Sequence, residues 1–125
     1  MTGPAAQTAR GTVARLGEEA AAQHLARNGY AILARNYRCR AGEIDVVARD
    51  PSGSIVFVEV RARSGATFGT PEESITTVKS GKMVACAMTY LAEHGAEQDW
   101  RIDFVGVDVR QGRVVRLRHL KHALG

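Results

Sequence analysis

The chain has 125 residues, enough for one domain with a hydrophobic core and too few for two ordinary domains. Its hydrophobic content of 45% is typical of a globular protein, and no apolar run approaches the roughly 20 residues of a membrane helix. The first ten residues lack the basic start and apolar stretch of a signal peptide. We therefore expect a cytoplasmic protein without a membrane partner.

The excess of basic over acidic residues, 17 against 13, gives a net charge of +4. The basic residues gather in two segments, residues 35–40 and residues 113–121. A basic surface around an acidic centre suits a polyanion held over a bound cation. The alternative is that these residues form solvated strand edges, which discourage aggregation of the sheet.

The two cysteines, Cys39 and Cys86, are isolated in the sequence and have no CxxC spacing or histidine-rich neighbourhood. In a cytoplasmic chain such cysteines stay reduced. We expect both to be packing residues rather than metal ligands.

The amino-terminal half predicts a helix followed by three strands. Residues 1–12 are expected to be a flexible tail and residues 13–125 a single domain. The helix runs from Val13 to Asn28, where Asn28-Gly29 is a typical stop. Its apolar stripe is Ala14, Ala21, Ala22 and Leu25. Glu18 lies on the same stripe, which is less common for a carboxylate, so it is either an edge residue or a functional one.

Three strands are predicted at residues 30–37, 42–49 and 54–63. The turn between the second and third is Asp50-Pro51-Ser52-Gly53, with Gly53 in the left-handed region. On the second strand Ile44, Val46 and Ala48 share one face, and Glu43, Asp45 and Val47 share the other. On the third strand Phe57, Glu59, Arg61 and Arg63 share a face.

This register places Asp45 directly opposite Glu59, with Cβ atoms roughly 5 Å apart. Two carboxylates at that distance repel each other, and a divalent cation that bridges them would explain the pair. The alternative is that each carboxylate forms its own salt bridge, with Arg61, Arg63 or Arg38.

The carboxy-terminal half predicts a second helix and two further strands. The helix begins with Thr70 as N-cap, Pro71 at the first position and Glu73 closing a capping box, and it ends at His94-Gly95. Its predicted core stripe is Val78, Gly81, Val84, Ala85, Met88 and Leu91. The strands, residues 101–109 and 113–120, flank a turn at Gln111-Gly112, and the first is apolar on both faces and therefore central. The order αβββαββ predicts an α/β fold with a mixed central sheet flanked by helices.

Several motifs resemble the YraN family, also called UPF0102, from about Gly17 to Val107. They are Gly17-Glu18-x-x-Ala with Leu25 and Gly29-Tyr30, Asn36-x-Arg38, Gly42-Glu43-Ile44-Asp45, Val56-Phe57-Val58-Glu59-Val60 with Arg63, Lys79, and Arg101-x-Asp103. The resemblance implies a restriction-endonuclease-like fold with a PD-(D/E)xK type site, similar to archaeal Holliday-junction resolvases.

Carried over to this chain, the resemblance makes Asp45 and Glu59 ligands of Mg²⁺ or Mn²⁺. Glu18 would complete the acidic cluster, and Glu43 would support the site, for example through water. Asp103 also matches a family position, and there we expect a structural ion pair.

Arg61 departs from the family pattern, in which a lysine lies two residues after the glutamate. A desolvated lysine can lose its proton and help to activate water, whereas arginine stays charged and can only position groups or stabilise negative charge. Three readings remain open. Arg61 supplies the electrostatic part while the metal activates the water, or Lys79 reaches in from the second helix, or catalysis is weak or absent.

The leading hypothesis is a metal-dependent nuclease that hydrolyses phosphodiesters in DNA, at branched or single-stranded structures. Arg61 would contact the phosphate, and Arg38, Arg63 and Lys79 would hold the backbone. The alternatives are a nucleic-acid-binding protein with a degenerate nuclease site, and an adaptor that binds only proteins. The small size of the domain favours a homodimer, although no sequence feature marks an interface.

Overall fold

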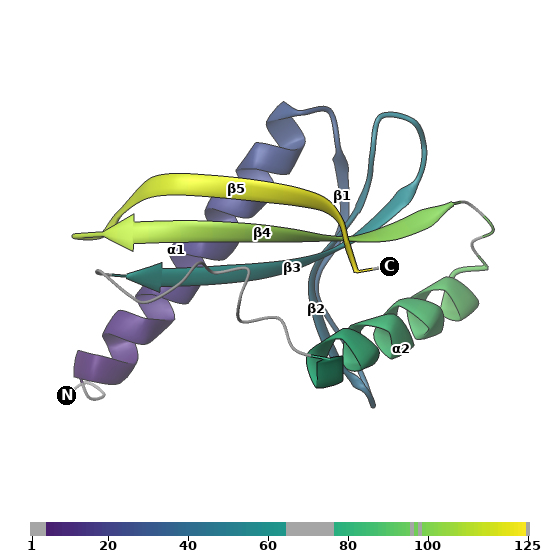
Figure 1. The fold of residues 1–125 in the computed structure, drawn as a ribbon, viewed down its shortest axis with the longest axis horizontal. Helices are drawn as coiled ribbons and strands as arrows, with labels where there is room; N and C mark the ends of the chain where they lie inside the picture. Colours follow the sequence, from purple (N-terminus) through teal and green to yellow (C-terminus); the bar gives the residue numbers. More distant parts are fainter. Residues whose placement is uncertain (1–4, 65–76, 96, 98, 125) are drawn as a thin grey trace.

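Within the residues that the structure describes, two helices and five strands follow one another in the predicted order αβββαββ (Figure 1). The computed structural model describes residues 5–64, 77–95, 97 and 99–124, without the side chains of residues 5–10, 77–80 and 124. The elements are α1 (Ala5–Arg27), β1 (Ala31–Cys39), β2 (Gly42–Arg49), β3 (Ile55–Ser64), α2 (Thr77–Glu93), β4 (Trp100–Arg110) and β5 (Arg113–Leu124).

The strands form one sheet in the order β1-β2-β3-β4-β5. β3 and β4 are parallel and the other neighbours are antiparallel, so the predicted mixed sheet is confirmed. Residues 102–107 of β4 are all buried, as expected for a central strand. In Figure 1, β3, β4 and β5 run across the view while β1 and β2 run steeply, so the sheet bends strongly between β2 and β3.

The two helices cover opposite faces of the sheet (Figure 1). α1 buries Ala21 and Leu25 against a valine-rich face of β2, β3 and β4. α2 packs on the other face, where Phe57 and Ile102 lie at the centre of a second cluster. Neither helix, within the described residues, is long and apolar enough to cross a membrane.

α1 begins eight residues before the predicted start. The helix runs from Ala5, so residues 5–12 belong to it, although the sequence analysis assigned them to a tail. The segment contains several alanines, the residue with the highest helix propensity, and this local preference extends the helix beyond its packed part. Residues 1–4 lie outside the described part of the chain.

The face of α2 that packs on the sheet differs from the predicted stripe. Its buried side chains are Met83, Cys86, Ala87 and Tyr90, and Leu91 is partly buried beside them. Four residues of the predicted stripe are exposed, so the prediction was wrong for them: Gly81, Val84, Ala85 and Met88. The reason is Tyr90, whose ring packs edge-on against Tyr37 and Phe57 and so decides which side of the helix faces inward. The predicted capping box at Thr70, Pro71 and Glu73 lies outside the described residues.

Both predicted turns are confirmed. Gly53 has a φ of 99°, and its N–H donates to the carbonyl of Asp50 at 2.9 Å. Gln111 and Gly112 have φ values of 51° and 75°, which suit a two-residue hairpin turn between antiparallel strands.

Asp103 forms the structural ion pair that we expected. It is fully buried, with Oδ1 at 2.9 Å from Nε of Arg101 and Oδ2 at 2.8 Å from Nε2 of His119. Arg101 also reaches Asp50 in the turn, at 2.6 Å. Although burial alone raises it, hydrogen bonds from His119 and Arg101 hold the pKa of Asp103 below its ordinary value. The cluster therefore ties β4 to β5 and to the β2–β3 turn.

Candidate active site

The alternation of side chains along β2 reverses at Asp45. Val46 packs in the cluster under α1, whereas Ile44 packs in the cluster under α2. The prediction that Ile44 shares a face with Val46 was therefore wrong. The facing residue on β1 is Asn36, which lies between the pairs Arg35↔Val46 and Tyr37↔Ile44 and has a left-handed φ of 54°. Such an irregular residue breaks the regular pleat, and asparagine accepts this conformation better than most residues.

Asp45 and Glu59 lie where pairing between β2 and β3 ends. The last pair at this end of the ladder is Val46↔Val58, and the next two residues in register are Asp45 and Glu59. Instead of continuing the ladder, Oδ2 of Asp45 accepts a hydrogen bond from the N–H of Val60 at 2.7 Å. The predicted register between β2 and β3 is confirmed. Beyond its last backbone pair, the side chain of Asp45 takes the place of the next backbone hydrogen-bond acceptor.

A pocket of about 380 Å³ opens at this split in the sheet. Because β2 separates from β3 there, residues of both helices line one cavity. The lining residues are Ala14 and Glu18 of α1, Gly42, Glu43 and Asp45 of β2, Glu59, Val60, Arg61 and Ala62 of β3, and Lys82 and Met83 of α2. The structure therefore brings together the five predicted residues Glu18, Glu43, Asp45, Glu59 and Arg61.

Gly17 allows α1 to approach the sheet closely enough for Glu18 to reach the pocket. A Cβ atom at Gly17 would lie 2.4 Å from Cβ of Ala62 and 3.8 Å from Cβ of Val107. Carbon atoms do not approach to 2.4 Å, so only glycine fits between α1 and β3 at this point. The position of Glu18 therefore depends on the residue before it.

The two central carboxyl groups share a proton in the metal-free protein. Burial, followed by the charges of Glu59 and Glu18, raises the pKa of Asp45 to about 8, against the opposing effect of the hydrogen bond from the N–H of Val60. Burial also raises the pKa of Glu59, against the opposing effect of Arg61. A hydrogen bond joins the two carboxyl groups, so the retained proton belongs to the pair. The repulsion that the sequence predicts is thus relieved by protonation.

The predicted arginines make different ion pairs. Nε of Arg61 lies 3.3 Å from Oε2 of Glu59, which is one of the salt bridges in the alternative reading. Arg38 pairs instead with Glu43 at 3.1 Å, in an exposed position. Arg63 lies 3.9 Å from Asp108 on the neighbouring strand β4. Asp45 has no salt bridge to any residue in the described part of the chain, so the alternative of separate salt bridges holds for Glu59 and not for Asp45.

Lys82 is a pocket residue that the sequence analysis did not select. Lys82 lies next to Met83, which faces the sheet. A Cβ atom built on Gly42 would lie 3.9 Å from the Cβ atom of Lys82. A correct prediction of the face of α2 that packs on the sheet would have placed Lys82 beside the pocket, but the apolar pattern predicted a different face. The side chain of Lys79, the predicted cation from this helix, lies outside the described residues.

The pocket suits a divalent cation held by two carboxylates. Among the described residues, no group of three or more His, Cys, Asp or Glu side chains is arranged to hold a metal ion. Mg²⁺ is commonly bound by one or two carboxylates, and water or substrate phosphate completes its coordination. Asp45 and Glu59 provide that minimal set of oxygen ligands, and Glu18 adds negative charge nearby.

Fold and pocket together define a class of protein, an α/β protein whose mixed sheet holds two coupled carboxyl groups between its helices. Residues 17–107 match the uncharacterised protein family UPF0102, and the chain belongs to this family. The resemblance stated from the motifs is confirmed.

Three UPF0102 proteins illustrate this membership. The protein of Desulforamulus reducens is 43% identical over 111 residues, which cover 86% of this chain and 91% of the relative. That of Roseiflexus castenholzii is 46% identical over 111 residues, 86% and 89% of the two chains. That of Chloroflexus aurantiacus is 45% identical over 120 residues, 94% and 97%.

Replacing Gly17 with alanine is expected to destabilise the fold by about 1–3 kcal/mol, because the new methyl group collides with Ala62. The matched control is Gly11→Ala in the same helix, where the nearest atom is the flexible end of Arg15 at 3.8 Å. That change should stabilise the helix by up to about 1 kcal/mol. Urea unfolding measures both free energies, and equal effects would contradict the close approach of α1.

The proton on Asp45 predicts an unusual pH dependence of stability. The folded state binds this proton more tightly than the unfolded state, in which the pKa is near 3.8. The free energy of unfolding of the metal-free protein should therefore fall as the pH rises from about 4 to about 8, as far as this group is concerned. Asp45→Asn imitates the protonated group and should be more stable than the wild type at pH 8.

Urea unfolding with a chelator, at about pH 5 and about pH 8.5, checks this expectation. The advantage of Asp45→Asn should shrink at the lower pH. Glu19→Gln serves as a control, because Glu19 pairs with Arg35 on the surface and its side chain is 57% exposed. An advantage of the same size at both pH values would show that Asp45 carries no shared proton.

Proposed function

We propose that this protein is a Mg²⁺- or Mn²⁺-dependent nuclease that hydrolyses phosphodiesters in DNA. The observation that carries the proposal is the pair of coupled carboxyl groups, Asp45 and Glu59, in a pocket that also holds cationic side chains. Such a pair weakens the fold as the pH rises, so it calls for a functional reason, and strongly shifted pKa values cluster at functional sites.

Asp45 and Glu59 would hold the cation. When bound, the ion would lower the pKa of a water molecule and offset the charge of the phosphate. The proton on Asp45 would have to leave first, so ion binding should release a proton near neutral pH. Glu18 would strengthen the attraction for the cation through its negative charge, and Glu43 would do so from the pocket rim.

Arg61 and Lys82 would act on the phosphate from two different elements that line the pocket. Arg61 comes from β3 and Lys82 from α2, and both side chains line the cavity. A guanidinium group binds phosphate oxygens in pairs, and an ammonium group adds a compact charge. Lys82 would thus take the role of the lysine that the family pattern has two residues after the glutamate, where this chain has Arg61.

Arg38 and Arg63 would hold the DNA backbone beside the pocket. Arg38 is 80% exposed and pairs with Glu43, whereas Arg63 is 26% exposed and lies near Asp108. An exposed ion pair such as that of Arg38 contributes little, so a phosphate can replace its carboxylate. Backbone contacts carry no sequence information, which favours selection by shape, at branched or single-stranded DNA. The homodimer and the role of Lys79 stay predictions.

The resemblance to restriction-endonuclease-like proteins supports the same function. Its implied residues Glu18, Asp45 and Glu59 line one pocket. Arg61 remains the departure from that pattern. Because of Arg61, a second candidate function is a nucleic-acid-binding protein that retains the carboxylates but does not cleave DNA.

Cleavage of flap, junction and single-stranded DNA in Mg²⁺ or Mn²⁺ tests the proposal. We expect activity in the wild type and a loss of at least about 100-fold in Asp45→Asn and Glu59→Gln, because even residues around metal ligands contribute 10–100-fold in typical sites. Glu19→Gln is the matched control, since Glu19 is an exposed partner of Arg35 on α1. No cleavage of any substrate, or cleavage that survives Asp45→Asn, would contradict a metal-dependent nuclease at this pocket.

The cationic side chains separate the two candidate functions. If Lys82 supplies the missing lysine, Lys82→Met should lower the cleavage rate by about 10–100-fold, while Arg61→Lys should leave it within a few-fold of the wild type. Single-turnover assays measure both rates. If the wild type binds DNA and Mn²⁺ without cutting and Arg61→Lys cuts, the protein is a binding protein with a degenerate site.

A further inference from the structure

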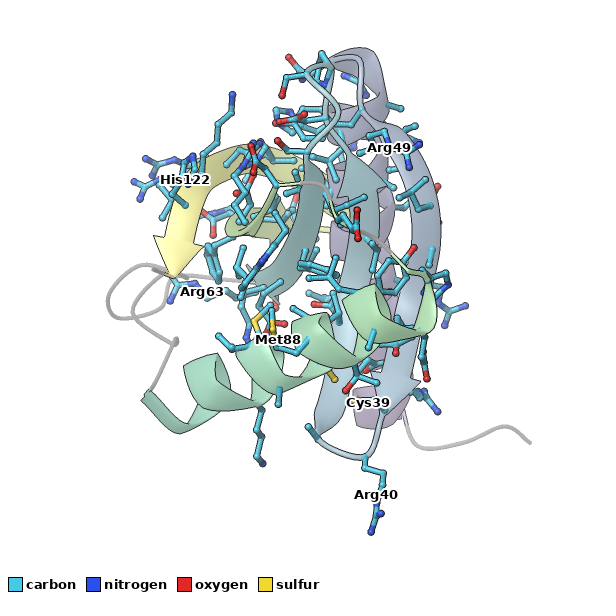
Figure 2. The ribbon with its side chains drawn as sticks, turned by 90° about the vertical axis from the view of Figure 1, so that its right-hand side faces the viewer. Cys39, Arg40, Arg49, Arg63, Met88 and His122 are labelled. Carbon is cyan, nitrogen blue, oxygen red and sulfur yellow. The ribbon has the colours of Figure 1, made fainter. Side chains whose placement is uncertain are left out.

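Cys39 and Cys86 are distant in the sequence and meet in the fold. Cys39 is the last residue of β1 and is partly exposed, whereas Cys86 lies on the inward face of α2 and is fully buried. Both belong to the cluster that packs between the sheet and α2. Figure 2 shows Cys39 beneath α2, at the end of the sheet from which Arg40 extends into solvent. Both are free thiols that pack in this cluster, as the sequence predicts, and the fold also brings them close to each other.

The sulfur of Cys39 is surrounded by hydrogen-bond donors. The N–H of Ala41 in the β1–β2 turn donates to Sγ of Cys39 at 3.3 Å. The thiol of Cys86 approaches the same sulfur from the protein interior. The partly exposed thiol of Cys39 thus accepts a hydrogen bond from the turn, and the buried thiol of Cys86 packs in the same cluster.

We propose that Cys39 is an oxidation site for hydroperoxides and that Cys86 is its resolving thiol, so that the two residues form a reversible disulfide between β1 and α2. An accessible thiolate beside a resolving cysteine is the arrangement by which proteins sense oxidants.

The chemistry requires a hydroperoxide and no other reagent. In the first step the Cys39 thiolate attacks the peroxide, the O–O bond breaks, and the products are Cys39 sulfenic acid and, after protonation, an alcohol or water. In the second step the sulfur of Cys86 attacks the sulfenic sulfur. The S–O bond breaks, a disulfide forms, and the thiol proton of Cys86 leaves with the hydroxyl group as water.

The electrostatics of the pair suit these roles. The thiol of Cys86, and then the N–H of Ala41, hold the pKa of Cys39 below its ordinary value, which favours the nucleophilic thiolate. Burial, together with the neighbouring Cys39, raises the pKa of Cys86 to about 12. Cys86 therefore keeps its proton until Cys39 has become an uncharged sulfenic acid, which removes the contribution of its charge.

The disulfide would connect two walls of the acidic pocket. Gly42 and Glu43 follow Cys39 across the β1–β2 turn and line the pocket, and Lys82 and Met83 precede Cys86 by one turn of α2 and line it too. A covalent bond between β1 and α2 would restrain these walls relative to each other. The inference does not depend on nuclease activity, because it concerns the thiols alone.

The test counts thiols in the full chain before and after treatment with hydrogen peroxide. The chain has two cysteines, and both should react with an alkylating agent in the unfolded, reduced protein. After peroxide treatment of the folded protein, neither should react, the intact mass should fall by two hydrogens, and dithiothreitol should restore both thiols. Two reactive thiols after treatment, disulfides only between chains, or sulfinic acid at Cys39 without a disulfide would each overturn the proposal.

Two variants assign the roles. In Cys86→Ala, the sulfenic acid on Cys39 should persist and be trapped by dimedone. In Cys39→Ala, the buried Cys86 should stay reduced under the same treatment. Circular dichroism checks that both variants fold, and the thiol count in the wild type decides the matter even if one does not. Trapping on Cys86 rather than Cys39 would reverse the assigned roles and overturn the proposal.

Discussion

The hydrogen bond from the N–H of Val60 to the carboxyl group of Asp45 is the constraint on which the site depends. It occurs where β2 and β3 stop pairing, and it satisfies a backbone group that the departing strand would otherwise leave without a partner. The same bond holds Asp45 beside Glu59. Because the strands separate here, the sheet no longer divides the two helices, and side chains from α1 and α2 reach one cavity.

One close contact beside the cavity requires a small residue. Gly17 lets α1 lie against Ala62 and carries Glu18 to the pocket, whereas a Cβ atom at Gly42 would make only an ordinary contact with Cβ of Lys82, at 3.9 Å. On the opposite side of the sheet from α1, Tyr90 sets the rotation of α2 and thereby decides which lysine borders the cavity. The packing of buried aromatic rings and the close contact at Gly17 thus determine where the charged residues lie.

Much of the fold follows from local patterns. The strand of residues 42–49 and the turns at Gly53 and Gly112 depend on alternation and on turn residues, which act over a few positions. The register that brings Asp45 to Glu59 follows from the turn length, so the carboxyl pair was predictable. The helix start at Ala5, the reversal at Asp45 and the rotation of α2 were not, because the first depends on weak propensity and the other two on packing with distant residues.

The sequence by itself determined the order of the elements, the family and four acidic residues of one pocket, because these depend on local periodicity and on motifs. Only the tertiary structure decided that burial raises the pKa values of Asp45 and Glu59, that Lys82 borders the cavity and that Cys39 and Cys86 pack in one cluster. Burial, charge and contact depend on which distant segments lie side by side. In this fold, the separation of β2 from β3 brings residues of both helices to one cavity, and the local sequence pattern does not contain that arrangement.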